Sequence, residues 1–123
     1  MMDAQLLVKK ILAGREQWLA LEPASGGAAA KRVCIRRPAR WDALPFHRGT
    51  TVDAVLKCVV AWDGFTEADL LGPELAPDDP VPFDAALLDV VMRDRIEWVD
   101  AISTKLVEMV SAAFERKEAT AKN

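Results

Sequence analysis

The chain has 123 residues, a net charge of −3, a single histidine and no tyrosine. This length fits one domain with one hydrophobic core, and half of the residues are hydrophobic. The acidic balance argues against a nucleic-acid-binding protein. No apolar run is long enough to span a bilayer, and the first residues lack the pattern of a signal peptide. We therefore expect a cytoplasmic protein with neither a nucleic-acid nor a membrane partner.

A local basic run is the exception to the acidic balance. It contains Lys31, Arg32, Arg36, Arg37 and Arg40. The favoured interpretation is a solvated strand face with its adjoining loop. The alternative is a contact to phosphate or to an acidic partner.

The two cysteines lie far apart in the sequence among apolar neighbours. Cys34 and Cys58 are typical of buried free thiols in a reducing compartment. A disulfide framework would need more cysteines in a shorter chain.

The first third of the chain predicts a helix followed by two strands. Residues 3–13 carry a partial helical stripe of leucines and isoleucine, and Gly14 is a plausible stop. Residues 16–22 and 31–37 alternate as strands do, with a glycine-containing loop between them. An isolated hairpin is marginal in water, so it must pack on helices or pair with another subunit.

The middle of the chain predicts short helical segments and a loop. A helix is expected over residues 51–62, although the β-branched pair Val59 and Val60 leaves a strand possible. A short turn over residues 66–71 is capped by its threonine. Residues 73–82 are rich in proline and form a loop.

The last third predicts two helices. Asp84 is a strong N-cap, and Phe83 before it is placed to meet Leu88 as a hydrophobic staple. That helix runs to about residue 93. A longer helix follows over residues 95–117, with an apolar stripe at three- and four-residue spacing made of Ile96, Val99, Ile102, Leu106, Met109, Val110, Ala113 and Phe114.

Together these elements predict a mainly α (α+β) fold. It is one small helical domain over residues 1–118, with one two-stranded β-hairpin near the N-terminus. Residues 119–123 form a polar, frayed tail.

No combination of residues predicts catalysis. His47 lies beside an arginine and a glycine, outside any recognisable motif. Asp78 and Asp79 lie in the proline loop without further ligands, and no Cys–His spacing suggests zinc. We therefore expect no catalytic residue, no metal, no cofactor and no enzymatic activity.

Several large apolar residues have two interpretations. Four aromatic residues lie near turns, and two apolar residues lie off the main stripe of the last helix. They either complete the core or form a surface for partner binding or self-association. The six candidates are Trp41, Trp62, Phe65, Phe83, Trp98 and Val107.

Two short motifs carry a family resemblance. The apolar run of residues 59–65, which contains Trp62-Asp-Gly-Phe65, is followed after a variable loop by Val81-Pro-Phe-Asp84 at the start of a helix. With the strand-then-proline segment ending at Pro38, this arrangement resembles tail assembly chaperones of long-tailed (siphovirus-like) phages and prophages. The resemblance covers roughly residues 32–118, and the longer proline-rich spacer departs from the family pattern.

The resemblance implies a non-catalytic role. Such a chaperone binds the long, helical tape measure protein, assists tail tube assembly, and forms homo-oligomers. It implies the tape measure protein and the tail tube protein as partners. It also implies residence in the host bacterial cytoplasm and absence from the mature virion.

Two other functions compete with the chaperone. One is a phage or prophage structural component, such as a head–tail connector that stays in the particle. The other is a small regulator that binds protein or DNA, and the acidic balance argues against DNA.

Overall fold

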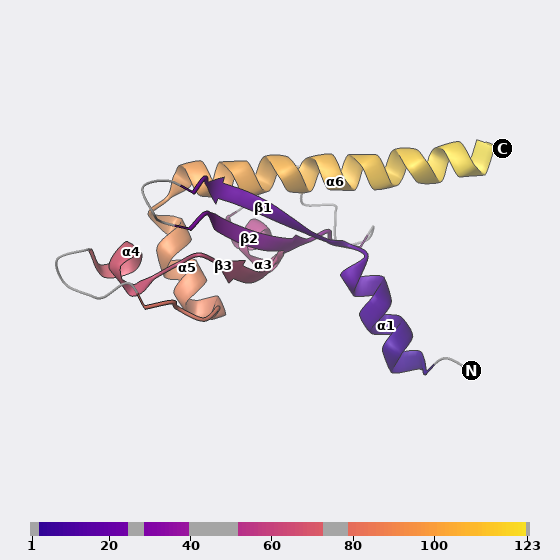
Figure 1. The fold of residues 1–123 in the computed structure, drawn as a ribbon. Coiled ribbons are helices and arrows are strands. Elements are labelled where there is room, and N and C mark those ends of the chain that lie inside the picture. Colours follow the sequence, from indigo (N-terminus) through magenta and orange to yellow (C-terminus); the bar gives the residue numbers. More distant parts are fainter. Residues whose placement is uncertain (1–2, 25–28, 40–51, 73–78, 123) are drawn as a thin grey trace.

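The computed structural model describes residues 3–24, 29–39, 52–72 and 79–122, with side chains up to residue 113. Within these residues the chain forms five helices and a three-stranded antiparallel sheet (Figure 1). The elements in chain order are α1 (Ala4–Ala13), β1 (Glu16–Glu22), β2 (Lys31–Arg36), α3 (Val52–Lys57), β3 (Val59–Asp63), α4 (Glu67–Leu71), α5 (Ala85–Arg93) and α6 (Ile96–Lys122).

The third strand corrects the predicted two-stranded hairpin. The helix expected over residues 51–62 ends at Lys57, and β3 then pairs antiparallel with β2, with Val33 opposite Trp62. The β-branched pair Val59 and Val60 suits a strand better than a helix. Pairing with β3 also gives β2 a partner on each side, which makes it the central strand. The fold is therefore a mixed helix and sheet domain rather than a helical domain with a lone hairpin.

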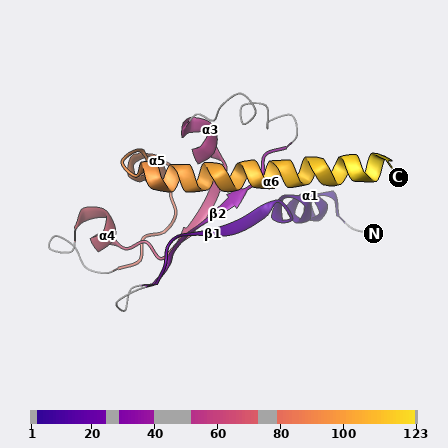
Figure 2. The same ribbon diagram turned by 90° about the horizontal axis from the view of Figure 1, so that it is seen from above.

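Helices cover one face of this sheet. Seen from above, α3, α5 and α6 lie on the same side of the strands (Figure 2), and α6 contacts β1 and β2. Strand alternation turns Val33 and Ile35 toward these helices, and both side chains are fully buried. The shared core includes Val33, Ile35, Val55, Val59, Trp62, Phe65, Leu88, Met92, Trp98, Val99, Ile102 and Leu106.

Several predicted helix ends are confirmed, but α6 continues to Lys122, beyond the end expected at residue 117 and into the segment expected to be frayed. α1 ends just before Gly14. Thr66 caps α4 in a reciprocal capping box with Asp69, and Asp84 caps α5 by accepting a hydrogen bond of 3.0 Å from the Leu87 amide. The predicted cap at Thr51 lies outside the described residues.

The two ends of the molecule differ in what they display. α4 and the corner between α5 and α6 lie at one end, and α1 lies at the other with the C-terminal part of α6 (Figures 1 and 2). With its 27 residues, α6 is about 40 Å long. The stripe of α6 is buried at Val99, Ile102 and Leu106, but Ile96 is 72% exposed at its start.

Candidate functional site: the open face of the sheet

In the described part of the chain, the face of the sheet turned away from the helices is open. No described helix lies over it, and Figure 1 looks directly onto it. The strand register places Trp18, Cys34 and Ala61 in one row across the three strands. This row forms the centre of what we call the open face.

Trp18 is the most prominent apolar side chain on the open face. It is 45% exposed, and the Arg32 guanidinium lies 4.9 Å from the centre of its ring. Arg32 in turn donates a hydrogen bond of 2.6 Å to Asp63 on β3. The ion pair and the cation–π contact hold the arginine over one part of the tryptophan. The rest of the ring is available to a partner.

A second ion pair flanks the row on its other side. Arg36 of β2 donates a hydrogen bond of 2.7 Å to Glu16 of β1. These two residues are opposite each other in the strand register, as are Arg32 and Asp63. The open face is therefore an apolar strip bordered by two charge pairs, which resembles the apolar centre and polar rim of protein interfaces.

The thiol in this row is buried and has a raised pKa. Cys34 is buried beneath its neighbours, and burial together with the nearby Glu16 carboxylate raises the pKa of its thiol. Cys58 lies in the core, where burial raises its pKa to about 11. Both cysteines are free, as predicted. Thiols with raised pKa values stay protonated at neutral pH and serve as small apolar groups.

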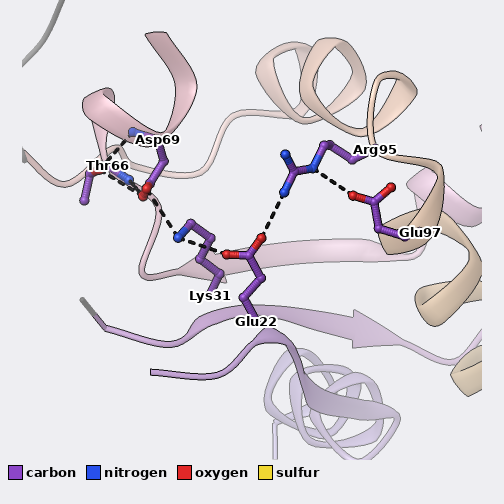
Figure 3. A network of polar contacts seen from close by, with 6 residues as sticks. All are labelled: Glu22, Lys31, Thr66, Asp69, Arg95 and Glu97. Atoms are coloured by element: carbon purple, nitrogen blue, oxygen red, sulfur yellow. Dashed lines mark hydrogen bonds and ion pairs between the residues drawn. The ribbon is translucent and has the colours of Figure 1, made fainter. Parts of the chain in front are cut away.

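The basic run of β2 is engaged mainly within the protein. Lys31 lies 3.3 Å from Glu22 and 3.3 Å from Asp69. Burial opposes the charge on Lys31, but its hydrogen bonds to Asp69 and Glu22 outweigh that effect and raise its pKa. Arg95 also pairs with Glu22, at 2.9 Å. As Figure 3 shows, the resulting network joins the hairpin to α4 and to the α5–α6 corner.

These pairs give the basic side chains partners within the protein, and the largely buried Lys31 is not part of a solvated face as predicted; a contact to phosphate stays a prediction. Arg32 and Arg36 are held by Asp63 and Glu16 on the open face. Of the predicted run, Arg40 lies outside the described residues.

Most of the predicted partner-binding residues lie in the core. Trp62, Phe65 and Trp98 are each less than 10% exposed. The rings of Trp62 and Phe65 stack at 4.6 Å, and Trp98 meets Phe65 edge-on at 5.7 Å. Phe83 meets Trp62 edge-on at 5.7 Å and is partly buried. In the structure these four side chains pack in or against the core.

The two remaining candidates differ from these four. Val107 is 41% exposed on α6. Trp41 lies outside the described residues. Partner binding by these two residues stays a prediction.

The described residues contain no metal-binding cluster of three or more histidine, cysteine, aspartate or glutamate side chains. His47 and Asp78 lie outside the described residues. A groove of about 530 Å³ lies between the start of β1 and α6, and its lining includes Arg15, Arg37, Lys105, Glu108 and Met109. Its charges are mixed. None of the helices in the described ranges is long and apolar enough to cross a membrane.

Sequence reasoning did not single out Trp18. The signal was present, because strand alternation puts Trp18 with Glu16 and Ala20 on the face opposite Leu19 and Leu21. A tryptophan on the polar face of a strand indicates either a further layer or a partner. Only the placement of the helices shows that no further layer covers it within the described residues.

Searches of protein-family models, of curated proteins and of solved structures find no match to this chain.

Proposed function

We propose that the chain is a tail assembly chaperone of a long-tailed phage or prophage, and that its open sheet face binds a helix of the tape measure protein. The assignment to tail assembly rests on the resemblance carried by residues 59–65 and 81–84. The observation that supports binding is the exposed Trp18 on the edge strand β1, in the middle row of a sheet face that no described helix covers.

The dimensions of the open face suit a helix. Neighbouring strands are about 4.8 Å apart, so three strands span roughly 10 Å. This width matches a helix with its side chains, about 10–12 Å across. On the opposite face of the same sheet, α6 packs against β1 and β2. A helix with an apolar stripe can lie on Trp18 and Ala61, with its polar flanks at the Arg32–Asp63 and Glu16–Arg36 pairs.

Trp18 is expected to supply much of the binding energy. Tryptophans near an interface centre are frequent hot spots, because a large rigid ring becomes desolvated at little entropic cost. Replacing it by aspartate puts a charge within the proposed contact. The fold tolerates this change, since Trp18 is half exposed and lies outside the core cluster.

The test is co-expression with the neighbouring tape measure gene. Wild-type protein should keep the tape measure protein soluble and be recovered in complex with it, and Trp18→Asp should lose both effects. The matched control is Leu71→Asp, which places the same charge at a 62% exposed apolar site on α4. The control should behave as wild type.

The outcomes separate two claims. If wild-type protein recovers no complex and leaves the solubility of the tape measure protein unchanged, the chaperone function is wrong. If Trp18→Asp recovers the complex as well as wild type, the function stands and the open face is the wrong site. Abundance in purified particles, measured by mass spectrometry, would instead indicate a structural component such as a head–tail connector.

A further inference from the structure

The two ends of the molecule carry opposite charge. Around α1, residues 3–17 together with Arg36 and Arg37 contain five basic and two acidic side chains. Around the α5–α6 corner, residues 84–100 contain two basic and five acidic side chains. The views place these groups at opposite ends of the domain (Figures 1 and 2).

The basic end also displays an apolar stripe that no described residue covers. α1 has no buried residue. Its Leu7, Val8 and Ile11 are 44%, 54% and 54% exposed and recur at helical spacing from Ala4. Lys9 and Lys10 flank this stripe and are exposed to solvent.

The acidic end displays matching apolar residues. Val90 on α5 is 66% exposed, and Ile96 at the start of α6 is 72% exposed. Asp94 and Asp100 lie close to them in the sequence, are exposed, and form no ion pair within the described part of the chain. Each end thus combines exposed aliphatic side chains with charged side chains of one dominant sign.

We infer that α1 of one copy docks on the α5–α6 corner of a second copy. Leu7, Val8 and Ile11 cover Val90 and Ile96, and Lys9 and Lys10 face Asp94 and Asp100. The contact is head-to-tail, so each copy keeps one unused end, and association continues beyond two copies. It uses neither Trp18 nor the open face, so it does not depend on the proposed client.

The strength of this association is expected to be modest and sensitive to salt. A 10-residue helix buries less than the roughly 800 Å² per partner of a standard interface. Exposed charge pairs are screened, because the Debye length falls from about 14 Å at 50 mM salt to about 4 Å at 500 mM. Association therefore appears at high protein concentration and low salt.

Sedimentation velocity tests this inference with a charge exchange. Wild-type protein at about 200 µM in 50 mM NaCl should sediment faster as its concentration rises, and should shift toward the monomer in 500 mM NaCl. Lys9→Glu/Lys10→Glu makes both ends acidic, and Asp94→Lys/Asp100→Lys makes both ends basic. Each variant should remain monomeric, and an equimolar mixture should regain at least half of the wild-type increase in sedimentation coefficient.

Two controls accompany the exchange. Lys57→Glu reverses the charge of an exposed side chain at the last residue of α3, which lies outside the basic and acidic ends of the molecule. This variant should associate as wild type. Trp18→Asp should also associate as wild type. That result would separate self-association from a failure of client binding. Circular dichroism confirms that each variant is folded, which is expected because all four exchanged residues are exposed.

Three results would overturn the inference. One is a monomeric wild type under all conditions. Another is normal association of Asp94→Lys/Asp100→Lys, which would mean that α1 meets a surface other than the acidic corner, such as α1 of a second copy. The third is a mixture of the two variants that stays monomeric.

Discussion

Replacing Gly64 by alanine should destabilise the domain far more than the same change at Gly72. Both glycines have positive φ angles, +86° and +103°, which L-residues adopt only with strain. A β-carbon at position 64 would lie 2.0 Å from the Ala30 carbonyl oxygen and 2.9 Å from its carbonyl carbon. A β-carbon at position 72 meets nothing within 4 Å. The pair therefore separates backbone strain from steric exclusion.

The expected magnitudes follow from these contacts. Strain at a glycine-favoured backbone conformation costs of order 1–3 kcal/mol, which is the whole effect expected at Gly72. At Gly64 the chain entering β2 must also move by more than 1 Å, and such overpacking adds roughly 1–3 kcal/mol or more. We expect Gly64→Ala to lower the free energy of unfolding by at least about 2 kcal/mol more than Gly72→Ala.

Urea denaturation followed by tryptophan fluorescence and by circular dichroism measures both variants. Coincident transitions by the two probes establish that a single free energy applies. If the free energies of unfolding of the two variants differ by less than about 0.5 kcal/mol, the close approach of Gly64 to Ala30 is wrong. The packing of β3 beside the start of β2 would then need to be revised.

Further changes test the core, the polar network and the thiols. Leu106→Ala, at a fully buried position, should lower the free energy of unfolding by about 2–5 kcal/mol. Val107→Ala, at the exposed neighbouring position, should lower it by less than about 0.5 kcal/mol. Equal losses of stability in urea titrations would contradict the assignment of Leu106 to the buried face of α6. Burial opposes the charge on Asp69, but hydrogen bonds from Thr66 and Lys31 outweigh it and lower its pKa. Asp69 therefore stabilises the fold above its unfolded pKa of about 4, and this stability is lost as pH falls through the lower folded pKa. Unfolding measured from pH 5 to pH 2 should show a smaller loss for Asp69→Asn than for wild type, and identical slopes would refute this role. Because the pKa of Cys58 is about 11, roughly one-thousandth of its thiol groups are ionised at pH 8. In a Cys34→Ala background, a thiol reagent should therefore label Cys58 only as urea unfolds the chain, and rapid labelling of native protein would place Cys58 outside the core.

The parts of the fold predicted correctly are those determined by local chemistry. Gly14 ends α1, and Thr66 and Asp84 cap their helices, because a cap depends on residues within one turn. The strands on either side of the glycine-containing loop also form as predicted, since their alternation is visible within a few residues.

The missed strand shows where local chemistry is insufficient. Val59, Val60 and Trp62 suit either a buried strand or a buried stretch of helix, and the sequence pattern does not separate the two. The decision comes from β2, which pairs with these residues across more than twenty intervening positions. Such pairing is tertiary, so it overrides the helix expected from the cap at Thr51.

The candidate site could not be predicted for a related reason. Strand alternation identifies two faces of β1, but it does not say which face the helices leave uncovered. The aromatic residues near turns were the more conspicuous candidates, and Trp62, Phe65 and Trp98 are buried against one another. Exposure of Trp18 follows from where α6 lies, which no motif in β1 records.

The absence of buried residues in α1 has a consequence for the order of this segment. Helices shorter than about 12–15 residues are only marginally populated in water, because nucleation is costly. None of the residues of α1 is buried in the described structure, so we expect its helix–coil equilibrium to depend mainly on the Asp3 cap and on Gly14 at its end. Any surface that covers Ile11 and its neighbours shifts that equilibrium, and the ordering entropy weakens the contact. Amide protons of α1 should accordingly exchange within seconds in dilute protein and markedly more slowly in concentrated solutions. The exchange rate of these amides therefore measures the fraction of α1 that is bound to another surface.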